Sequence, residues 1–171
     1  VLAIHAEGSL EAEKLMIVNA VAGVVFLLVG GILAVGIVLT RWPAIHWLEA
    51  DTFYQVLTAH GIDMLIFWII FFEMAVLYFC ASTLLRCRLA TPKMAWLAFA
   101  LMLIGAVVNN YAVYKGGSSV MMTSYVPMMA EQSFYLGLIL FAVGALIGCF
   151  VFFGTLVVAK RDKTYEGSVP L

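Results

Sequence analysis

The sequence predicts an all-α integral membrane protein, a single membrane domain over residues 1–171 built as a bundle of four transmembrane helices. Its composition and the length of its apolar runs carry this prediction. Hydrophobic residues make up 65% of the chain and charged residues only 11%, and the mean hydropathy is +1.09. A soluble domain has about a quarter charged residues. Four apolar runs are also long enough for the ~20 residues that a helix needs to cross a bilayer.

The four runs lie at about residues 15–39, 53–85, 94–114 and 133–159. Hydrocarbon admits only helices or closed barrels, because every backbone polar group there needs a partner inside the protein. The runs show no alternation of polar and apolar residues, so we expect helices. Small residues in the first run favour the close approach of a neighbouring helix; they include Gly23, Gly30, Gly31 and Gly36.

The lysines and arginines predict the orientation in the membrane. Four crossings place both termini and the loop after the second helix on one side. The positive-inside rule assigns the more basic side to the cytoplasm, so we expect cytoplasmic termini and an outward-facing Arg41 and Lys115. The net charge of −1 does not indicate a nucleic-acid partner. The residues on the basic side are Lys14, Arg86, Arg88, Lys93, Lys160, Arg161 and Lys163.

His60 is the candidate functional residue of the second helix, one to two turns below the predicted outer surface. A histidine costs free energy in hydrocarbon and needs a partner there. Neutral imidazole is a common metal ligand and an axial ligand of haem iron. A hydrogen bond to water or to a carbonyl is the alternative interpretation. The absence of a side chain at Gly61 would let a flat macrocycle approach the helix.

Other polar residues lie inside the predicted helices. Asp63 follows His60 by three residues, so the two share a helix face, and we expect a local hydrogen bond from it. Glu73 lies deeper, where a carboxyl either joins helices through a hydrogen bond or serves as a step in a proton path. Asn109 and Asn110 in the third helix are expected to donate hydrogen bonds to other helices.

Three blocks follow one another along the chain, at residues 54–61, 123–128 and 160–171. Together they resemble subunit I of the haem-copper oxidases. Residues 54–61, YQVLTAHG, resemble its second transmembrane helix, and the T-x-H-G version is most similar to the B-type (ba3-like) oxidases. Residues 123–128, TSYVPM, followed by SFYLG, are similar to the T-x-Y-P-P-L loop and the helix after it, with Val126 in place of the first proline. The basic residues 160–163 through the final VPL resemble the loop after the fourth helix.

The resemblance implies that the four helices are part of a larger haem-copper oxidase helix bundle. It implies that His60 is one axial ligand of the low-spin haem, which passes electrons to a high-spin haem and copper where oxygen is reduced. The second axial histidine, the copper ligands and the high-spin haem ligand come from later helices of the family. We therefore expect the N-terminal portion of a split subunit I, which cannot reduce oxygen alone and shares its haem with a partner chain.

The expected partners are the remaining half of subunit I, a copper-binding electron-entry subunit, and cytochrome c, a cupredoxin or a quinol as electron donor. We expect the complex in a prokaryotic inner membrane. Arg41, at the outer end of the first helix, either pairs with a haem propionate or a lipid phosphate, or anchors the helix at the interface. Two alternatives stay open: a relative of the nitric oxide reductases, and a four-helix anchor subunit without a redox centre.

Overall fold

A computed structural model describes residues 2–164, with side chains from residue 10 onward. The described part is entirely helical and contains no strand. Two of its elements, η1 and η2, are π-helical turns, which are wider than α-helical ones. The elements are α1 (Leu2–Arg41), α2 (Ala50–Ile62), η1 (Asp63–Phe67), α3 (Trp68–Tyr78), η2 (Phe79–Leu84), α4 (Pro92–Tyr114) and α5 (Gln132–Asp162).

Four helical stretches of the described chain are long and apolar enough to cross a membrane, which confirms the predicted bundle. They are Leu10–Arg41, Ala50–Leu84, Pro92–Tyr114 and Gln132–Asp162. The predicted start of the first helix was too late, because α1 begins at Leu2. A hydropathy profile detects only the apolar part of a helix. Alanine, glutamate and lysine have high helix propensity, so the helix continues beyond the apolar run. The VPL motif of residues 169–171 lies outside the described residues.

The second span is one continuous helix made of α2, η1, α3 and η2. Its two π-helical turns begin at Asp63, directly after the turn that carries His60, and at Phe79. A π turn holds more residues than an α turn, so it rotates all later side chains about the helix axis. A count at 3.6 residues per turn therefore misplaces the residues after Asp63 relative to His60.

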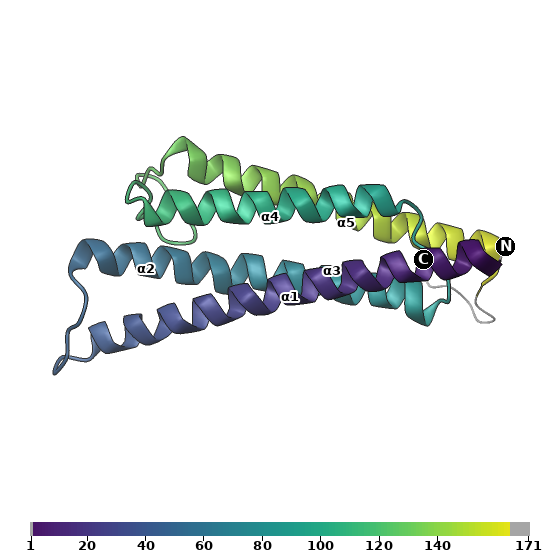
Figure 1. Cartoon of the computed structure of the whole chain (residues 1–171). Coiled ribbons are helices and arrows are strands. Elements are labelled where there is room, and N and C mark those ends of the chain that lie inside the picture. The colour runs from purple at the N-terminus through teal and green to yellow at the C-terminus, as the bar shows by residue number, and fades with distance from the viewer. Residues whose placement is uncertain (1, 165–171) are drawn as a thin grey trace.

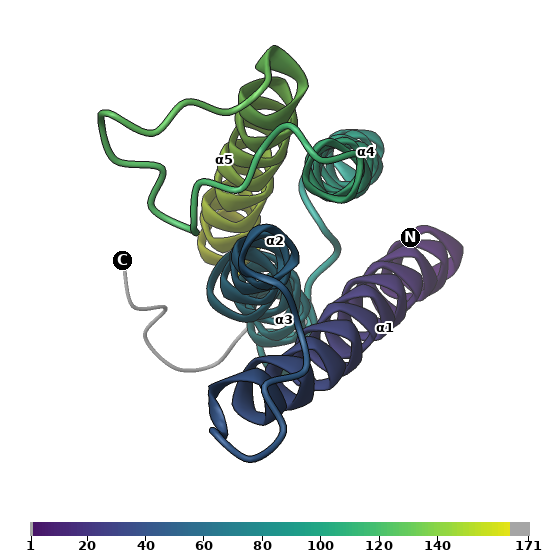
Figure 2. The ribbon, with the colours of Figure 1, turned by 90° about the vertical axis from the view of Figure 1, so that its left-hand side faces the viewer.

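The four spans run up and down along one axis, so that α1 begins and α5 ends at the same end of the bundle (Figure 1). Two pairs make most of the contacts in the bundle, α1 with the second span and α4 with α5. In the end-on view, α1 crosses the second span at an angle, and its C-terminal end lies farther from α4 than its N-terminal end does (Figure 2). Near the N-terminal end, the indole of Trp96 donates a hydrogen bond of 2.8 Å to Glu11 and ties α4 to α1.

Aromatic rings at the centre join all four spans. Phe71 of α3 stacks on Phe26 of α1 with ring centroids 5.7 Å apart, and its edge meets Phe99 of α4 at 5.9 Å. Phe141 of α5 lies 4.7 Å from Phe67 and 5.5 Å from Phe71. Such ring pairs add stabilisation beyond the area that they bury, so this cluster fixes the second span against its three neighbours.

Glycines set the close contact between α4 and α5. A Cβ added to Gly105 would lie 2.5 Å from the Phe141 nitrogen, and one added to Gly137 would lie 2.6 Å from the Asn109 nitrogen. Backbone atoms at these distances cannot move aside as a flexible side chain can. Small residues of this kind let membrane helices approach until their backbones touch, so these two positions determine the spacing of the pair.

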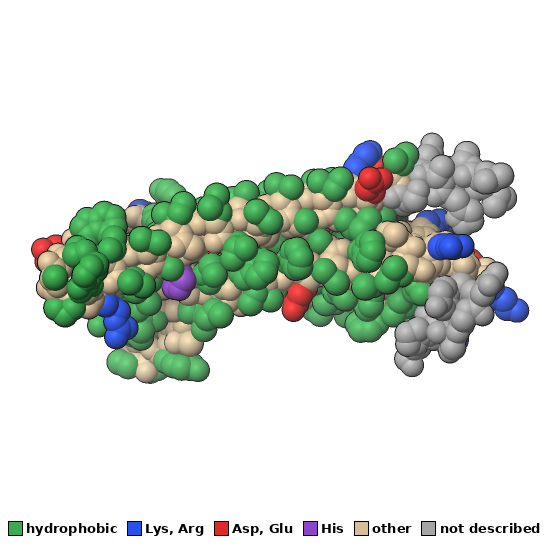
Figure 3. All heavy atoms as spheres, turned by 90° about the horizontal axis from the view of Figure 1, so that it is seen from below, with side chains coloured by type: hydrophobic (Ala, Val, Ile, Leu, Met, Phe, Trp, Pro, Cys, Tyr) green, Lys and Arg blue, Asp and Glu red, His purple; other side chains and the backbone are tan. Residues whose placement is uncertain are grey.

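The outer surface is apolar along the length of the spans. The face in Figure 3 is largely hydrophobic, and its lysines and arginines lie toward the two ends. Exposed apolar side chains line α1 in particular, including Leu28 at 63%, Ile32 at 63% and Val38 at 65% exposure. In water a surface of this extent would drive aggregation, whereas lipid tails or further apolar helices solvate it.

Candidate functional site

His60 is held against α1 by a single hydrogen bond. Its Nδ1 lies 2.9 Å from the backbone carbonyl oxygen of Gly30. A carbonyl only accepts, so Nδ1 carries the proton and donates. In the neutral ring this leaves the lone pair on Nε2, and no described group hydrogen-bonds to that atom. The ring is half-buried, so it is oriented but remains open on one side.

Gly30 reaches the ring because it has no side chain. A Cβ at Gly30 would lie 2.7 Å from both Cγ and Sδ of Met64, which follows His60 by one turn. The backbone of α1 therefore lies directly against the second span at this level. The adjacent Gly31 faces open space, with no atom within 4 Å of an added Cβ. Of the two glycines, only Gly30 makes the close contact.

The loop after α4 packs against the other side of this turn. A Cβ at Gly61 would lie 2.9 Å from Cβ of Met122. The backbone nitrogen of Met121 donates a 2.8 Å hydrogen bond to the hydroxyl of Thr58, which itself donates to the Tyr54 carbonyl. Gly61 thus makes room for this loop, and its contact with a macrocycle stays a prediction.

Asp63 joins the second span to α4. The side-chain nitrogen of Asn110 donates a 2.8 Å hydrogen bond to Oδ1 of Asp63, while Oδ2 has no partner among the described residues. The Asp63 side chain is fully buried. Asn109 points the other way and donates a 2.9 Å bond to the carbonyl of Phe134 in α5. The predicted interhelical roles of both asparagines are confirmed.

Arg41 is the last residue of α1, as predicted, and it is exposed. It lines an open hollow of about 460 Å³ together with His46 and, from the start of α2, Phe53 and Tyr54. Exposed aromatic side chains flank it: Trp42 is 56% and Trp47 is 62% exposed. The Arg41 guanidinium therefore lies at the same end of the bundle as the His60 turn.

Glu73 is exposed on α3, in the middle of the second span. Its neighbours Phe72 and Val76 are exposed as well, at 42% and 44%. No hydrogen bond or ion pair joins it to another side chain of the described range. The structure therefore brings Gly30 and Met64 to the His60 turn, but it leaves Glu73 on the outer surface of the four spans.

Residues 14–171 match the model of the family described as cytochrome c and quinol oxidase polypeptide I. The chain belongs to that family. No curated protein matches it. Among solved structures, it is similar to a chain of a haem-copper terminal oxidase dimer determined by cryo-EM, with 24% sequence identity and a TM-score of 0.80. The match covers 93% of this chain and 28% of that one.

Its four spans are thus a portion of the helix bundle of a polypeptide I, and their fold is the expected one. The chain spans about a quarter of the length of the oxidase chain that it matches. Among the described residues, no three histidine, cysteine, aspartate or glutamate side chains gather into a metal site.

Two residues of the His60 surroundings were not predicted from the sequence of this family member. The sequence marks Gly30 only as a small residue for helix packing, and no local pattern marks Met122. The pair Gly30–Gly31 in the middle of a membrane helix is a signal for a close approach, but the partner of that approach lies 30 residues away in the sequence. Only the crossing of α1 over the second span identifies it.

Proposed function

We propose that this chain is the N-terminal portion of a haem-copper oxidase subunit I, and that His60 is one axial ligand of its low-spin haem. The hydrogen bond from Nδ1 to the Gly30 carbonyl carries the proposal. Histidines that bind metals almost always donate their other ring proton in this way, which fixes the tautomer and makes the ligating nitrogen more basic. The residues around His60 therefore fit an iron ligand.

The haem, when bound, supplies a one-electron carrier whose potential depends on its axial ligands and its surroundings. This chain contributes the position of the imidazole and an apolar wall. The hydrogen bond from Nδ1 to the Gly30 carbonyl orients the imidazole and so sets the direction in which Nε2 points. The absence of a side chain at Gly30 lets α1 lie close to Met64 at this level. The helices of subunit I beyond this portion supply the second axial histidine, the high-spin haem and the copper ligands.

The proposal extends to the partners and the orientation. A copper-binding subunit receives electrons at the outer face from cytochrome c, a cupredoxin or a quinol. The chain lies in a prokaryotic inner membrane with its termini in the cytoplasm, since the basic loop after the second span and the basic end of α5 share one end of the bundle. The Arg41 guanidinium, on the opposite end, pairs with a haem propionate, as its planar fork suits a carboxylate.

Glu73 has a separate proposed role. A carboxyl exposed to hydrocarbon is costly, so an ionisable residue at this depth faces a protein partner or a proton path. We propose that the remaining helices of subunit I cover this face and that the Glu73 carboxyl accepts and releases protons in a path between them. In the assembled oxidase, Glu73→Gln should lower the number of protons moved per electron more than it lowers oxygen uptake. Equal loss of both, or no loss, would exclude this role, and Glu49→Gln in the outer loop is the control.

Spectroscopy of the assembled complex tests the ligand. His60→Ala should remove the low-spin haem absorption bands, because iron loses one of its two strong axial ligands. The matched control is His46→Ala, since His46 is an exposed histidine of the loop at the same end. Haem content per protein is measured alongside, so that loss of the whole complex is distinguished from loss of one ligand. Unchanged low-spin bands in His60→Ala would refute the assignment.

A further inference from the structure

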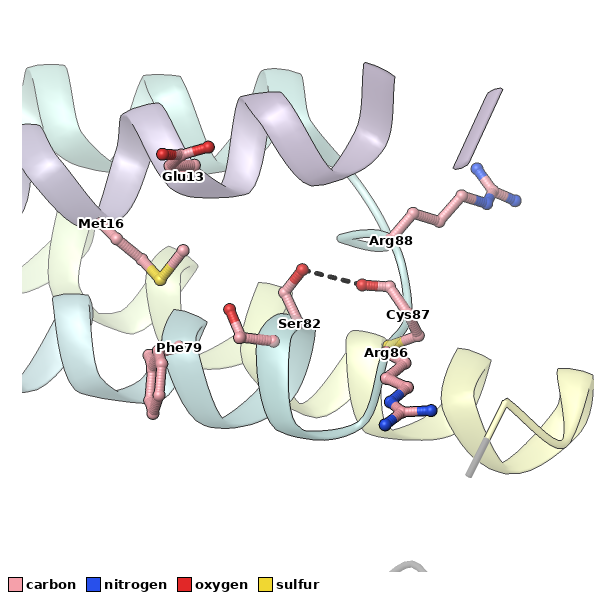
Figure 4. A pocket seen from close by; sticks show the side chains of 8 residues that line it. Glu13, Met16, Phe79, Ser82, Arg86, Cys87 and Arg88 are labelled. Carbon is pink, nitrogen blue, oxygen red and sulfur yellow. Dashed lines mark hydrogen bonds between the residues drawn. The ribbon is translucent and has the colours of Figure 1, made fainter. Parts of the chain in front are cut away.

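A pocket of about 600 Å³ opens between α1 and the end of the second span (Figure 4). It lies at the end of the bundle opposite the His60 turn, and it shares no lining residue with the His60 site. Its lining is amphipathic. The apolar side chains of Met16 and Phe79 lie on the side toward the middle of the spans, and the two arginines lie on the side of the loop after η2. The lining residues are Glu13, Met16, Phe79, Ser82, Thr83, Arg86, Cys87 and Arg88.

The loop that carries the two arginines is held in place by its own hydrogen bonds. The hydroxyl of Ser82 donates to the Cys87 carbonyl at 2.8 Å, the bond drawn in Figure 4. The Cys87 thiol donates to the Ala81 carbonyl at 3.1 Å, and the Ala90 nitrogen donates to the hydroxyl of Thr155 in α5 at 3.1 Å. A ligand therefore meets arginines whose backbone is already ordered, which reduces the entropy lost on binding.

Arg86 occupies a backbone conformation that favours glycine. Its φ is 50°, in the left-handed region, where it ends the helix. Helices commonly end with glycine at this position, because an L side chain is strained there. The backbone nitrogen of Arg86 bonds to the Thr83 carbonyl at 3.4 Å, so the turn itself needs no arginine side chain. The long cationic side chain is thus placed at the pocket against a local preference.

The side chains that line the pocket carry a net positive charge. No ion pair within 4.0 Å joins Arg86 or Arg88 to a described carboxylate, although Glu13 lines the opposite wall on α1. Two guanidinium groups and one carboxylate leave one positive charge. That balance matches one phosphodiester, and guanidinium is the side-chain group best suited to phosphate oxygens.

We propose that this pocket binds the headgroup of a membrane phospholipid. Arg86 and Arg88 hold its phosphodiester, and its acyl chains lie along Met16 and Phe79, toward the apolar part of the spans. The Glu13 carboxylate accepts a hydrogen bond from the headgroup, which selects ethanolamine or glycerol headgroups over choline, because choline has no donor. Basic pockets between membrane helices on the cytoplasmic side are typical lipid headgroup sites, and this is the more basic end of the bundle.

Lipid-dependent stability of the assembled complex tests the site. The complex is purified in detergent, stripped of lipid, and given phosphatidylethanolamine, phosphatidylglycerol, phosphatidylcholine or inorganic phosphate. The first two should raise the thermal denaturation midpoint by about 2–4 °C, since a ligand of the native state stabilises it. Native mass spectrometry of the same samples counts retained lipid. Equal effects of phosphatidylcholine, or of inorganic phosphate alone, would overturn the proposal.

Paired variants locate the effect. Arg86→Gln combined with Arg88→Gln should abolish the lipid-dependent rise, whereas Lys93→Gln combined with Lys160→Gln should keep it. The second pair removes two charges from the same end, but neither residue lines the pocket. Glu13→Leu, which removes the hydrogen-bond acceptor, should reduce the preference for phosphatidylethanolamine over phosphatidylcholine. If both double variants responded alike, the lipid effect would come from the surface charge and not from this pocket.

Discussion

The carbonyl oxygen of Gly30 accepts a hydrogen bond from Nδ1 of His60 at 2.9 Å, across 30 residues of sequence. This bond fixes which ring nitrogen can bind a metal and in which direction it points. A glycine in one helix thereby acts as a positioning residue for a histidine in the next, through its backbone alone. On the proposed ligation by His60, small changes in α1 should alter the environment of the haem, although α1 supplies no ligand to it.

Gly30→Ala tests this relationship directly. The new methyl group would lie 2.7 Å from Met64, so α1 or the methionine has to move. We expect a shifted or weakened low-spin haem spectrum in the assembled complex and a loss of stability of about 1–3 kcal/mol from overpacking. Gly31→Ala is the control, since its methyl group meets nothing within 4 Å. Identical spectra for both variants would contradict the expected displacement of α1 relative to His60.

Removing only one partner of the hydrogen bond between Asn110 and Asp63 should cost more stability than an average hydrogen bond contributes, because the other partner stays buried without it. Asn110→Leu leaves the buried Asp63 carboxyl without its described donor, and we expect a loss of about 1–2 kcal/mol. The double variant with Asp63→Leu should be less destabilised than the sum of the two single variants. Unfolding of the purified protein in mixed detergent measures all three, and strict additivity would argue against the bond.

The contact between α4 and α5 should not tolerate a methyl group at Gly137. Its Cβ would lie 2.6 Å from the Asn109 nitrogen and 2.7 Å from the Gly105 oxygen, both backbone atoms. Gly137→Ala should therefore destabilise the protein by about 1–3 kcal/mol. Gly154→Ala in the same helix is the matched control, because its nearest contact would be 3.4 Å from the Ala90 methyl group. A similar change of stability in both variants would mean that the close approach at Gly137 does not decide it, because alanine by itself favours a helix over glycine.

Cys87 should resist alkylation in the folded protein. Burial raises the pKa of its thiol above the ordinary value, so the reactive thiolate is scarcer than for a free cysteine at the same pH. In a variant with Cys80→Ser and Cys149→Ser, iodoacetamide at about pH 8.5, near the pKa of a free thiol, should label the protein slowly until denaturant is added. Rapid labelling of the native protein would contradict the burial of this loop.

The four membrane-length helices and the need of His60 for a hydrogen-bond partner could be predicted because both depend on local properties. Apolar length predicts a span, and the cost of an imidazole in hydrocarbon marks it as a residue with a partner. The ends of the helices were less predictable. α1 extends back to Leu2 because its polar N-terminal residues are good helix formers, which a hydropathy profile does not register.

The surroundings of His60 were predicted in part. Hydrogen bonds from Asn109 and Asn110 to other helices were expected from their residue type, but not their acceptors. Gly61 shows the limit more clearly: its missing side chain was interpreted as space for a cofactor, which stays a prediction, and its close approach to Met122 was not predicted. Nothing in the local sequence relates residue 61 to a loop that begins after the next helix.

The sequence by itself determined a four-helix membrane bundle, the more basic of its two ends, and the histidine that has to find a partner. Composition and spacing along the chain are sufficient for these features. Each depends on the free energy of transferring one segment or one side chain from water into the membrane. The tertiary structure alone decided that the Gly30 carbonyl meets His60, that Asn110 meets Asp63, and that Arg86 and Arg88 share a pocket with Glu13. These pairings depend on how helices cross and on the extra rotation of the π-helical turns, and neither is encoded in any single segment.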